Sequence, residues 1–178
     1  TATEIPKLHP SQINAFYEDG YIILRSVFGR DDVEIMRMAM DRLAHMAQRF
    51  DTTTMHLGTQ FVVERVPQES RRIHRVVWAG AAAPVLSAYG SDVRILAPAA
   101  QLLRSNAVEQ LINQVHFKYP GDGVAFEWHQ DSRHRRYGSP LWTDVDGRGS
   151  FVEVITAIDP MTEDNGPLRV IPGSNRLG

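Results

Sequence analysis

The sequence contains no cysteine. Disulfides and thiolate zinc sites are therefore excluded, and any metal chemistry would have to use His, Asp and Glu side chains. The formal net charge of only -2 gives no strong attraction to nucleic acid or to an anionic membrane. No apolar run approaches the length needed to span a bilayer, and the first ten residues do not have a signal-peptide pattern. We therefore expect a soluble, cytoplasmic protein with neither nucleic acid nor a membrane as a partner.

The 178 residues, 43% of them hydrophobic, suit one domain with a real core, and we expect a single domain over residues 1–178. Its first part, about residues 1–107, is predicted to be mostly helical. The sequence indicates helices at 10–19 and 31–50, short helical pieces over 71–103, and strands at 21–27 and 61–66. Asp31 is the expected N-cap of the long helix. That helix should bury one stripe of apolar residues at spacings of three and four: Val33, Met36, Met40, Leu43 and Ala47.

The second part, from about residue 108, changes character. Residues 109–119, 126–131, 151–158 and 168–171 are typical of strands, and they are separated by turn-forming clusters such as PGDG and DNG. Helices followed by a run of strands predict an α+β domain built around an antiparallel sheet or sandwich.

The most informative motif in the chain is WHQD at residues 128–131. On a strand, side chains alternate between faces, so His129 and Asp131 would point the same way while Gln130 points opposite. Such a pair supplies two of the three ligands of a 2-His-1-carboxylate triad, which leaves open positions on Fe(II). Taken alone, the motif favours a surface histidine beside a solvated aspartate over a metal site.

A second polar pattern lies in the strand expected at 109–119, where Gln114, His116 and Lys118 share one face. Polar strand faces are usually in contact with water, which favours a solvated face. The interpretation changes if this face and the pair His129 and Asp131 line the same cavity. His116 is compatible with a hydrogen-bonded core or pocket histidine at least as well as with a functional residue.

Three separated segments resemble one known family. They are FYEDGYIILRSVFGRDDVEIMR near the start, QVHFKYPGDGVAFEWHQDS around the metal motif, and VITAIDPMTEDNGPLRVIPGSNRLG at the end. In this order they resemble the phytanoyl-CoA dioxygenase family of Fe(II)/2-oxoglutarate oxygenases, which includes ectoine-hydroxylase-like enzymes. The resemblance implies a double-stranded β-helix (a cupin-like jelly-roll), mainly β and formed from residues 108–178, with the N-terminal helices packed on its sheet.

The resemblance also implies roles for individual residues. His129 and Asp131 match two iron ligands and thereby the catalytic centre, Lys118 matches a lysine that reaches the 2-oxoglutarate carboxylate, and Gln114 matches a residue that contacts co-substrate or substrate. The family's third iron ligand, a histidine, and its arginine for the distal carboxylate are expected beyond Gly178. The chain is therefore expected to be incomplete at its C-terminus.

The implied reaction uses Fe(II), 2-oxoglutarate and O2 to hydroxylate an unactivated C–H bond of a small molecule, with release of succinate and CO2. Asp131 favours hydroxylation, because related halogenases have a small residue at that position. Trp128 and Arg133 are candidate substrate contacts, although Arg133, Arg135 and Arg136 are equally compatible with a solvated loop. No feature indicates an oligomeric state.

Two other functions stay open. A non-catalytic jelly-roll binding module, or a fragment lacking the third iron ligand, would account for the two-ligand motif. A cupin-like metal-dependent isomerase or hydrolase would act without O2 or 2-oxoglutarate.

Overall fold

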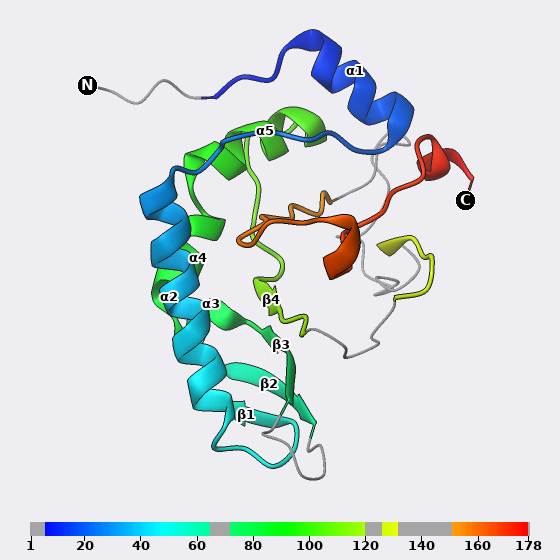
Figure 1. The fold of residues 1–178 in the computed structure, drawn as a ribbon. Helices are drawn as coiled ribbons and strands as arrows, with labels where there is room; N and C mark the ends of the chain where they lie inside the picture. The colour runs from blue at the N-terminus through cyan, green and yellow to red at the C-terminus, as the bar shows by residue number, and fades with distance from the viewer. Residues whose placement is uncertain (1–5, 65–71, 120–125, 132–150, 178) are drawn as a thin grey trace, which may run out of the picture.

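The computed structural model describes residues 6–64, 72–119, 126–131 and 151–177. Five helices, four strands and two 3-10 turns follow one another among these residues (Figure 1). In chain order they are α1 (Pro10–Asp19), α2 (Arg30–Ala47), β1 (Thr54–His56), β2 (Thr59–Glu64), β3 (Arg72–Val77), α3 (Ala79–Ala82), α4 (Pro84–Gly90), α5 (Val93–Leu103), β4 (Gln114–His116), η2 (Glu163–Asn165) and η3 (Ser174–Arg176).

Helix α1 has the predicted bounds, and its end residues explain why. The His9 side chain accepts a hydrogen bond from the backbone N–H of Ser11, and Pro10 occupies the first turn, where no N–H is needed. Gly20 ends the helix in the left-handed conformation, with φ of 86°, a conformation that favours glycine. A Cβ at Gly20 would also lie only 2.9 Å from Asn175, so the C-terminal turn packs tightly against this helix end.

Helix α2 confirms the predicted apolar stripe but begins earlier than expected. Its N-cap is Gly29 rather than Asp31, and the Asp32 carboxylate accepts a hydrogen bond from the Gly29 N–H at 3.1 Å. The N-cap prediction was wrong because the chain offers two consecutive aspartates, and the second is the one that bonds back. The helix ends at Ala47, short of residue 50. Its buried residues are Met36, Ala39, Leu43 and Ala47.

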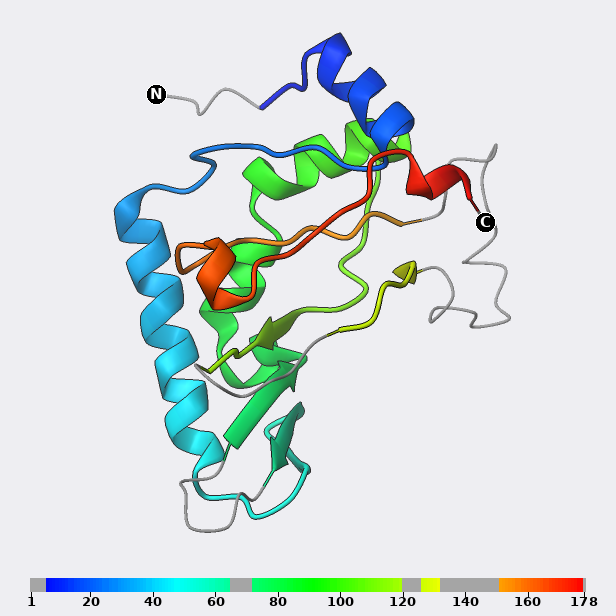
Figure 2. The same cartoon turned by 45° about the vertical axis from the view of Figure 1, so that its right-hand side comes forward.

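The four strands form an antiparallel sheet in the order β1-β2-β3-β4. Phe61, Val76 and Val115 lie opposite one another across the last three strands and are all buried. Together with α2, α3 and α4 they form the main hydrophobic core (Figures 1 and 2). Strand β3 occupies residues predicted to be helical. That prediction was wrong because the stretch RIHRVV has two partner strands, and cross-strand packing outweighs weak helix propensity.

Most of the other predicted strands do not form. Residues 21–27, 126–131, 151–158 and 168–171 contain no strand, and the segment 109–119 keeps only the three residues of β4. The four segments without a strand all leave large apolar side chains exposed, such as Ile23, Trp128 and Ile155. A β-rich segment becomes a strand only where a partner backbone pairs with it. The predicted jelly-roll is therefore not seen among the described residues, which show a mixture of helices and one antiparallel sheet.

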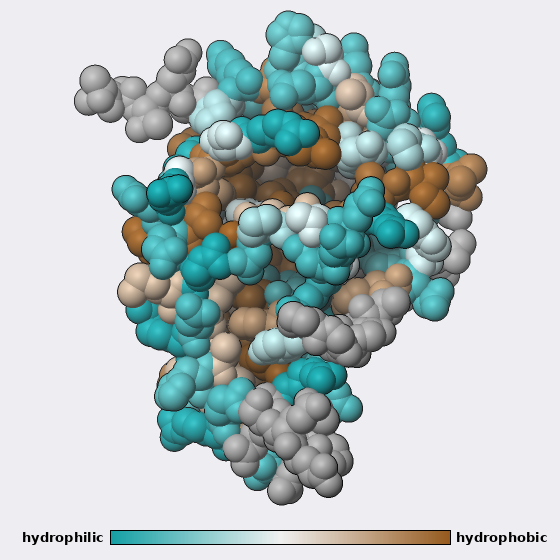
Figure 3. Space-filling view, in the orientation of Figure 1, coloured by the Kyte–Doolittle hydropathy of each residue, from teal (hydrophilic) through white to brown (hydrophobic). Residues whose placement is uncertain are grey.

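Residues 151–177 cross the molecule above β4 and end beside α1 (Figures 1 and 2). Two hydrogen bonds fix this return: the Gly173 N–H donates to the Asp19 carbonyl at 2.8 Å, and the Asn175 amide donates to the Tyr17 carbonyl at 3.2 Å. A hollow lined by apolar atoms separates this crossing from the link between α1 and α2 (Figure 3). In the described part of the chain, no helix has the length and apolar character to cross a membrane.

An ionic cluster joins the start of α2 to α5. Arg94 bonds to the Asp92 carboxylate at 2.8 Å and to the Asp32 carboxylate at 2.7 Å, and its guanidinium lies 4.5 Å from the centre of the Phe28 ring. Tyr89 donates to Asp32 at 2.9 Å. The hydrogen bond from Arg94 is the main cause that lowers the pKa of both carboxyl groups, and Tyr89 lowers that of Asp32 further.

We expect this cluster to make part of the stability acid-sensitive. The ordinary carboxyl pKa is 3.8, and the folded values of Asp32 and Asp92 lie lower. The cluster's contribution should be complete above the ordinary pKa and lost as pH falls through the folded values. Urea unfolding of Arg94→Met should show a smaller loss of stability between pH 5 and pH 2.5 than the unaltered protein. Replacement of the exposed Arg42 by Met should keep the unaltered pH dependence; equal slopes for all three proteins would exclude the cluster as the cause.

Candidate metal site

The structure brings His129 and Asp131 together. The Nε2 atom of His129 lies 3.4 Å from an Asp131 carboxylate oxygen, and the two side chains are 40% and 43% exposed. Residues 126–130 do not form the strand from which this pairing was predicted. The two side chains nevertheless lie close together. The strand that was expected to bring them together does not form.

A local hydrogen bond sets the orientation of the imidazole. His129 Nδ1 lies 2.6 Å from the carbonyl oxygen of Glu127. Because a carbonyl only accepts hydrogen bonds, Nδ1 must carry the proton of this bond. The other ring nitrogen, Nε2, faces Asp131. An imidazole that donates through one nitrogen presents the other to a metal in a fixed orientation. Neighbouring ligands at about 2.1 Å from one ion lie about 3 Å apart, so a donor separation of 3.4 Å fits a divalent cation.

The pair is not joined by a third ligand within the described ranges, where no group of three or more His, Asp or Glu side chains is placed to hold a metal. Three of the four histidines of the N-terminal half make other contacts, and His45 is exposed in the last turn of α2. His9 caps α1, His56 packs against Phe50, and His74 bonds to the Glu64 carboxylate at 2.9 Å.

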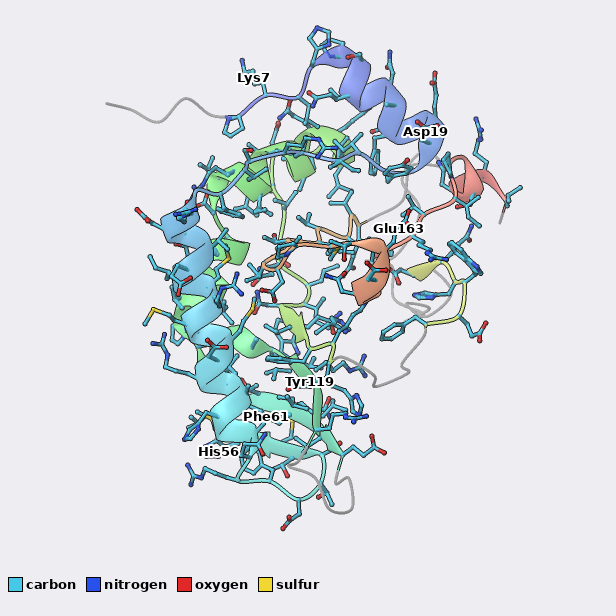
Figure 4. The ribbon with its side chains drawn as sticks, viewed as in Figure 1. Lys7, Asp19, His56, Phe61, Tyr119 and Glu163 are labelled. Carbon is cyan, nitrogen blue, oxygen red and sulfur yellow. The ribbon has the colours of Figure 1, made fainter. Side chains whose placement is uncertain are left out.

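The structure also places the residues predicted to bind the co-substrate. Gln114 and His116 occupy the first and last positions of β4, and the intervening Val115 is buried, so the expected alternation is present here. Lys118 follows two residues later and is exposed; its ammonium group donates to the carbonyl of Gly166. This contact ties the end of β4 to the turn at η2, where Figure 4 labels Glu163.

His116 links β4 to the segment that carries the metal pair. Its ring packs edge-on against Phe126, with 6.2 Å between the ring centres. The loss of water on the packed side lowers the pKa of the His116 imidazole, and the positive charges of Arg75 and Lys118 lower it further. The face with Gln114 and His116 therefore lies next to the segment with His129 and Asp131. His116 is itself exposed, and the side chains of His129 and Asp131 are 40% and 43% exposed, so these neighbouring groups are open to water rather than enclosed.

Of the two predicted substrate contacts, Trp128 and Arg133, the structure describes only Trp128. Trp128 is 64% exposed and adjacent in sequence to the metal pair, so its indole is accessible to another molecule. Arg133 and the neighbouring arginines 135 and 136 lie outside the described residues. Sequence reasoning missed Gly166, whose carbonyl accepts from Lys118, and Gln130, whose amide donates to the Ser174 carbonyl at 2.7 Å. The only signals for them were the NG turn and a polar residue between two ligands.

The family assignment rests on most of the chain. Residues 16–178 match a model of the phytanoyl-CoA dioxygenase (PhyH) family, so the chain belongs to this family. It is 30% identical over 167 residues to the ectoine dioxygenase of Sphingopyxis alaskensis, covering 93% of this chain and 49% of that protein. It is 27% identical over 176 residues to the ectoine dioxygenase of Nocardia farcinica, covering 96% and 52%.

A shorter similarity, 37% over 67 residues, relates 36% of the chain to 22% of the L-proline trans-4-hydroxylase of Streptomyces griseoviridis. The chain thus spans about half the length of the ectoine dioxygenases that it matches. No solved structure matches it.

Proposed function

We propose that the protein containing this chain is an Fe(II)/2-oxoglutarate-dependent dioxygenase that hydroxylates a small molecule. The observation that carries the proposal is the His129–Asp131 pair, with donor atoms 3.4 Å apart and the histidine oriented by the Glu127 carbonyl. Membership of the phytanoyl-CoA dioxygenase family supports the same chemistry. When bound, iron, 2-oxoglutarate and O2 would supply oxidative decarboxylation to succinate and CO2 together with C–H hydroxylation.

The residues of this chain would bind and orient. His129 and Asp131 would hold the iron, and the third ligand, a histidine, would come from outside residues 1–178, as would the arginine for the distal carboxylate of 2-oxoglutarate. Lys118 would neutralise a carboxylate of the co-substrate, for which its ammonium must leave the Gly166 carbonyl. Gln114 would contact the co-substrate or the substrate from the same strand. The complete domain is proposed to be the family's jelly-roll.

Trp128 and Arg133 are the residues of this chain proposed to contact the substrate. An exposed indole beside the metal pair offers an apolar surface, and an arginine offers a fork for a carboxylate. The names of the relatives supply the first candidates, so ectoine and L-proline are the compounds to assay first.

One observation favours a second candidate function. Because the described residues present two metal donors rather than three, a jelly-roll module that binds without catalysis would also fit. The two functions differ in whether a metal and 2-oxoglutarate bind together.

Anaerobic addition of Fe(II) and 2-oxoglutarate to the full-length protein tests the proposal. We expect a weak visible charge-transfer band, because 2-oxoglutarate chelates iron only where protein ligands leave adjacent positions open. The band should be lost in His129→Ala and kept in His45→Ala, a replacement of an exposed histidine in the last turn of α2. A full-length protein without the band would contradict the dioxygenase and favour the binding module.

A further inference from the structure

The residue between the two metal donors makes a long-range contact that the proposed chemistry has not used. Gln130 is half-buried, and its side-chain Nε2 donates to the Ser174 carbonyl at 2.7 Å, 44 residues further along the chain. The acceptor is a carbonyl, so the amide nitrogen must be the atom that faces it. While His129 and Asp131 meet each other, the residue between them is attached to a different part of the molecule.

The acceptor turn is itself held firmly. Ser174 begins η3, and the residue before it, Gly173, donates its N–H to the Asp19 carbonyl at 2.8 Å. The residue after it, Asn175, donates to the Tyr17 carbonyl at 3.2 Å. Figure 4 shows Asp19 at the end of α1, beside this turn.

Helix α1 is in turn attached to α5. The Tyr17 hydroxyl donates to the Leu102 carbonyl, and the Arg104 guanidinium lies 5.3 Å from the centre of the Tyr17 ring. Gln130 therefore connects residues 126–130, which have no regular secondary structure, to a turn that is docked on two packed helices.

We propose that Gln130 is a positioning residue for the metal pair. Residues 126–130 lack the ladder of backbone hydrogen bonds that would hold His129 and Asp131 in a strand. The bond to Ser174 takes over that task, because it attaches the residue between the two donors to the docked turn. Ligands held by outer contacts bind their metal more tightly, and loss of such a contact typically costs about 10- to 100-fold in affinity. This inference rests on the proposed iron site.

The test compares Fe(II) dissociation constants measured anaerobically for the full-length protein and its variants. Gln130→Met keeps the length of the side chain and removes the amide; Gln130→Glu keeps the shape and places a carboxylate against the Ser174 carbonyl. Both should raise the dissociation constant about 10- to 100-fold. The matched control is Gln101→Met, because Gln101 is also a bonded glutamine, and its partners Leu8 and Ala97 lie outside the segment that carries the metal pair.

Urea unfolding separates positioning from general destabilisation. Gln101→Met should lower the unfolding midpoint at least as much as Gln130→Met and leave Fe(II) affinity within about twofold of the unaltered protein. If both Gln130 variants bind Fe(II) as tightly as the unaltered protein, or if Gln101→Met weakens Fe(II) equally, Gln130 has no positioning role. If Gln130→Met does not fold, the Fe(II) dissociation constant of Gln130→Glu is compared with those of the unaltered protein and Gln101→Met instead. Failure of the unaltered protein to bind Fe(II) would instead remove the proposed function.

Discussion

Replacement of Asp131 by alanine is expected to lower 2-oxoglutarate turnover by the full-length protein by at least about a hundredfold. Changes to residues around metal ligands already cost about 10- to 100-fold in affinity or activity, and loss of a ligand should cost more. Asp131 provides the carboxylate that lies 3.4 Å from His129 Nε2, and its removal leaves one donor of the pair. Succinate formed from 2-oxoglutarate, measured with excess Fe(II), is the readout.

The control for this experiment is Asp41→Ala. Asp41 is an exposed aspartate in α2, so its loss changes charge without touching the metal pair. It should keep turnover within about twofold, as expected for a surface change away from the site. Unchanged turnover in Asp131→Ala would show that Asp131 is not a ligand, whatever the reaction of the protein.

Replacement of Phe61 by alanine is expected to lower the free energy of unfolding by about 3–5 kcal/mol. Phe61 is fully buried in β2, lies opposite Val76 of β3, and has its ring centre 5.2 Å from that of Phe50. Figure 4 shows it in the sheet beside the C-terminal end of α2. Alanine would remove the whole ring and leave a cavity that strand and helix backbones cannot fully close.

Urea denaturation measures this effect, with Ile23→Ala as the control. Ile23 is also a large apolar residue but is 67% exposed, so its truncation should change stability by no more than about 0.5 kcal/mol. A loss below about 1 kcal/mol for Phe61→Ala would mean that the sheet does not pack as described.

The helices were more accessible from the sequence than the strands. Pro10 and Gly20 mark the ends of α1 by local backbone chemistry, and the stripe from Met36 to Ala47 repeats with helical spacing. Both signals lie within a few residues of the element that they predict. A strand needs a partner whose place is set by the whole fold, so residues 151–158 have strand composition without a strand. For the same reason β3 was mistaken for helix.

In the candidate site, too, the sequence predicted contacts between neighbouring residues but not contacts between residues far apart in the chain. Two ligand-type residues at a spacing of two predicted the His129–Asp131 pair, and the pair forms although the strand does not. The contact of Lys118 with Gly166 and that of Gln130 with Ser174 join residues more than 40 positions apart. No pattern along the chain encodes such a partner, because its place is known only once the turns have folded back.

The lengths of the two outer strands have a consequence for solubility. Among the residues that the structure describes, the sheet ends in β1 on one side and β4 on the other, and each has three residues. At about 3.3 Å per residue, each edge offers only about 10 Å of backbone to a strand from another molecule. Short edges of this kind hinder the edge-to-edge pairing that starts β-aggregation. Within the described sheet, the longer β2 and β3 are the central strands, where both of their sides are already paired.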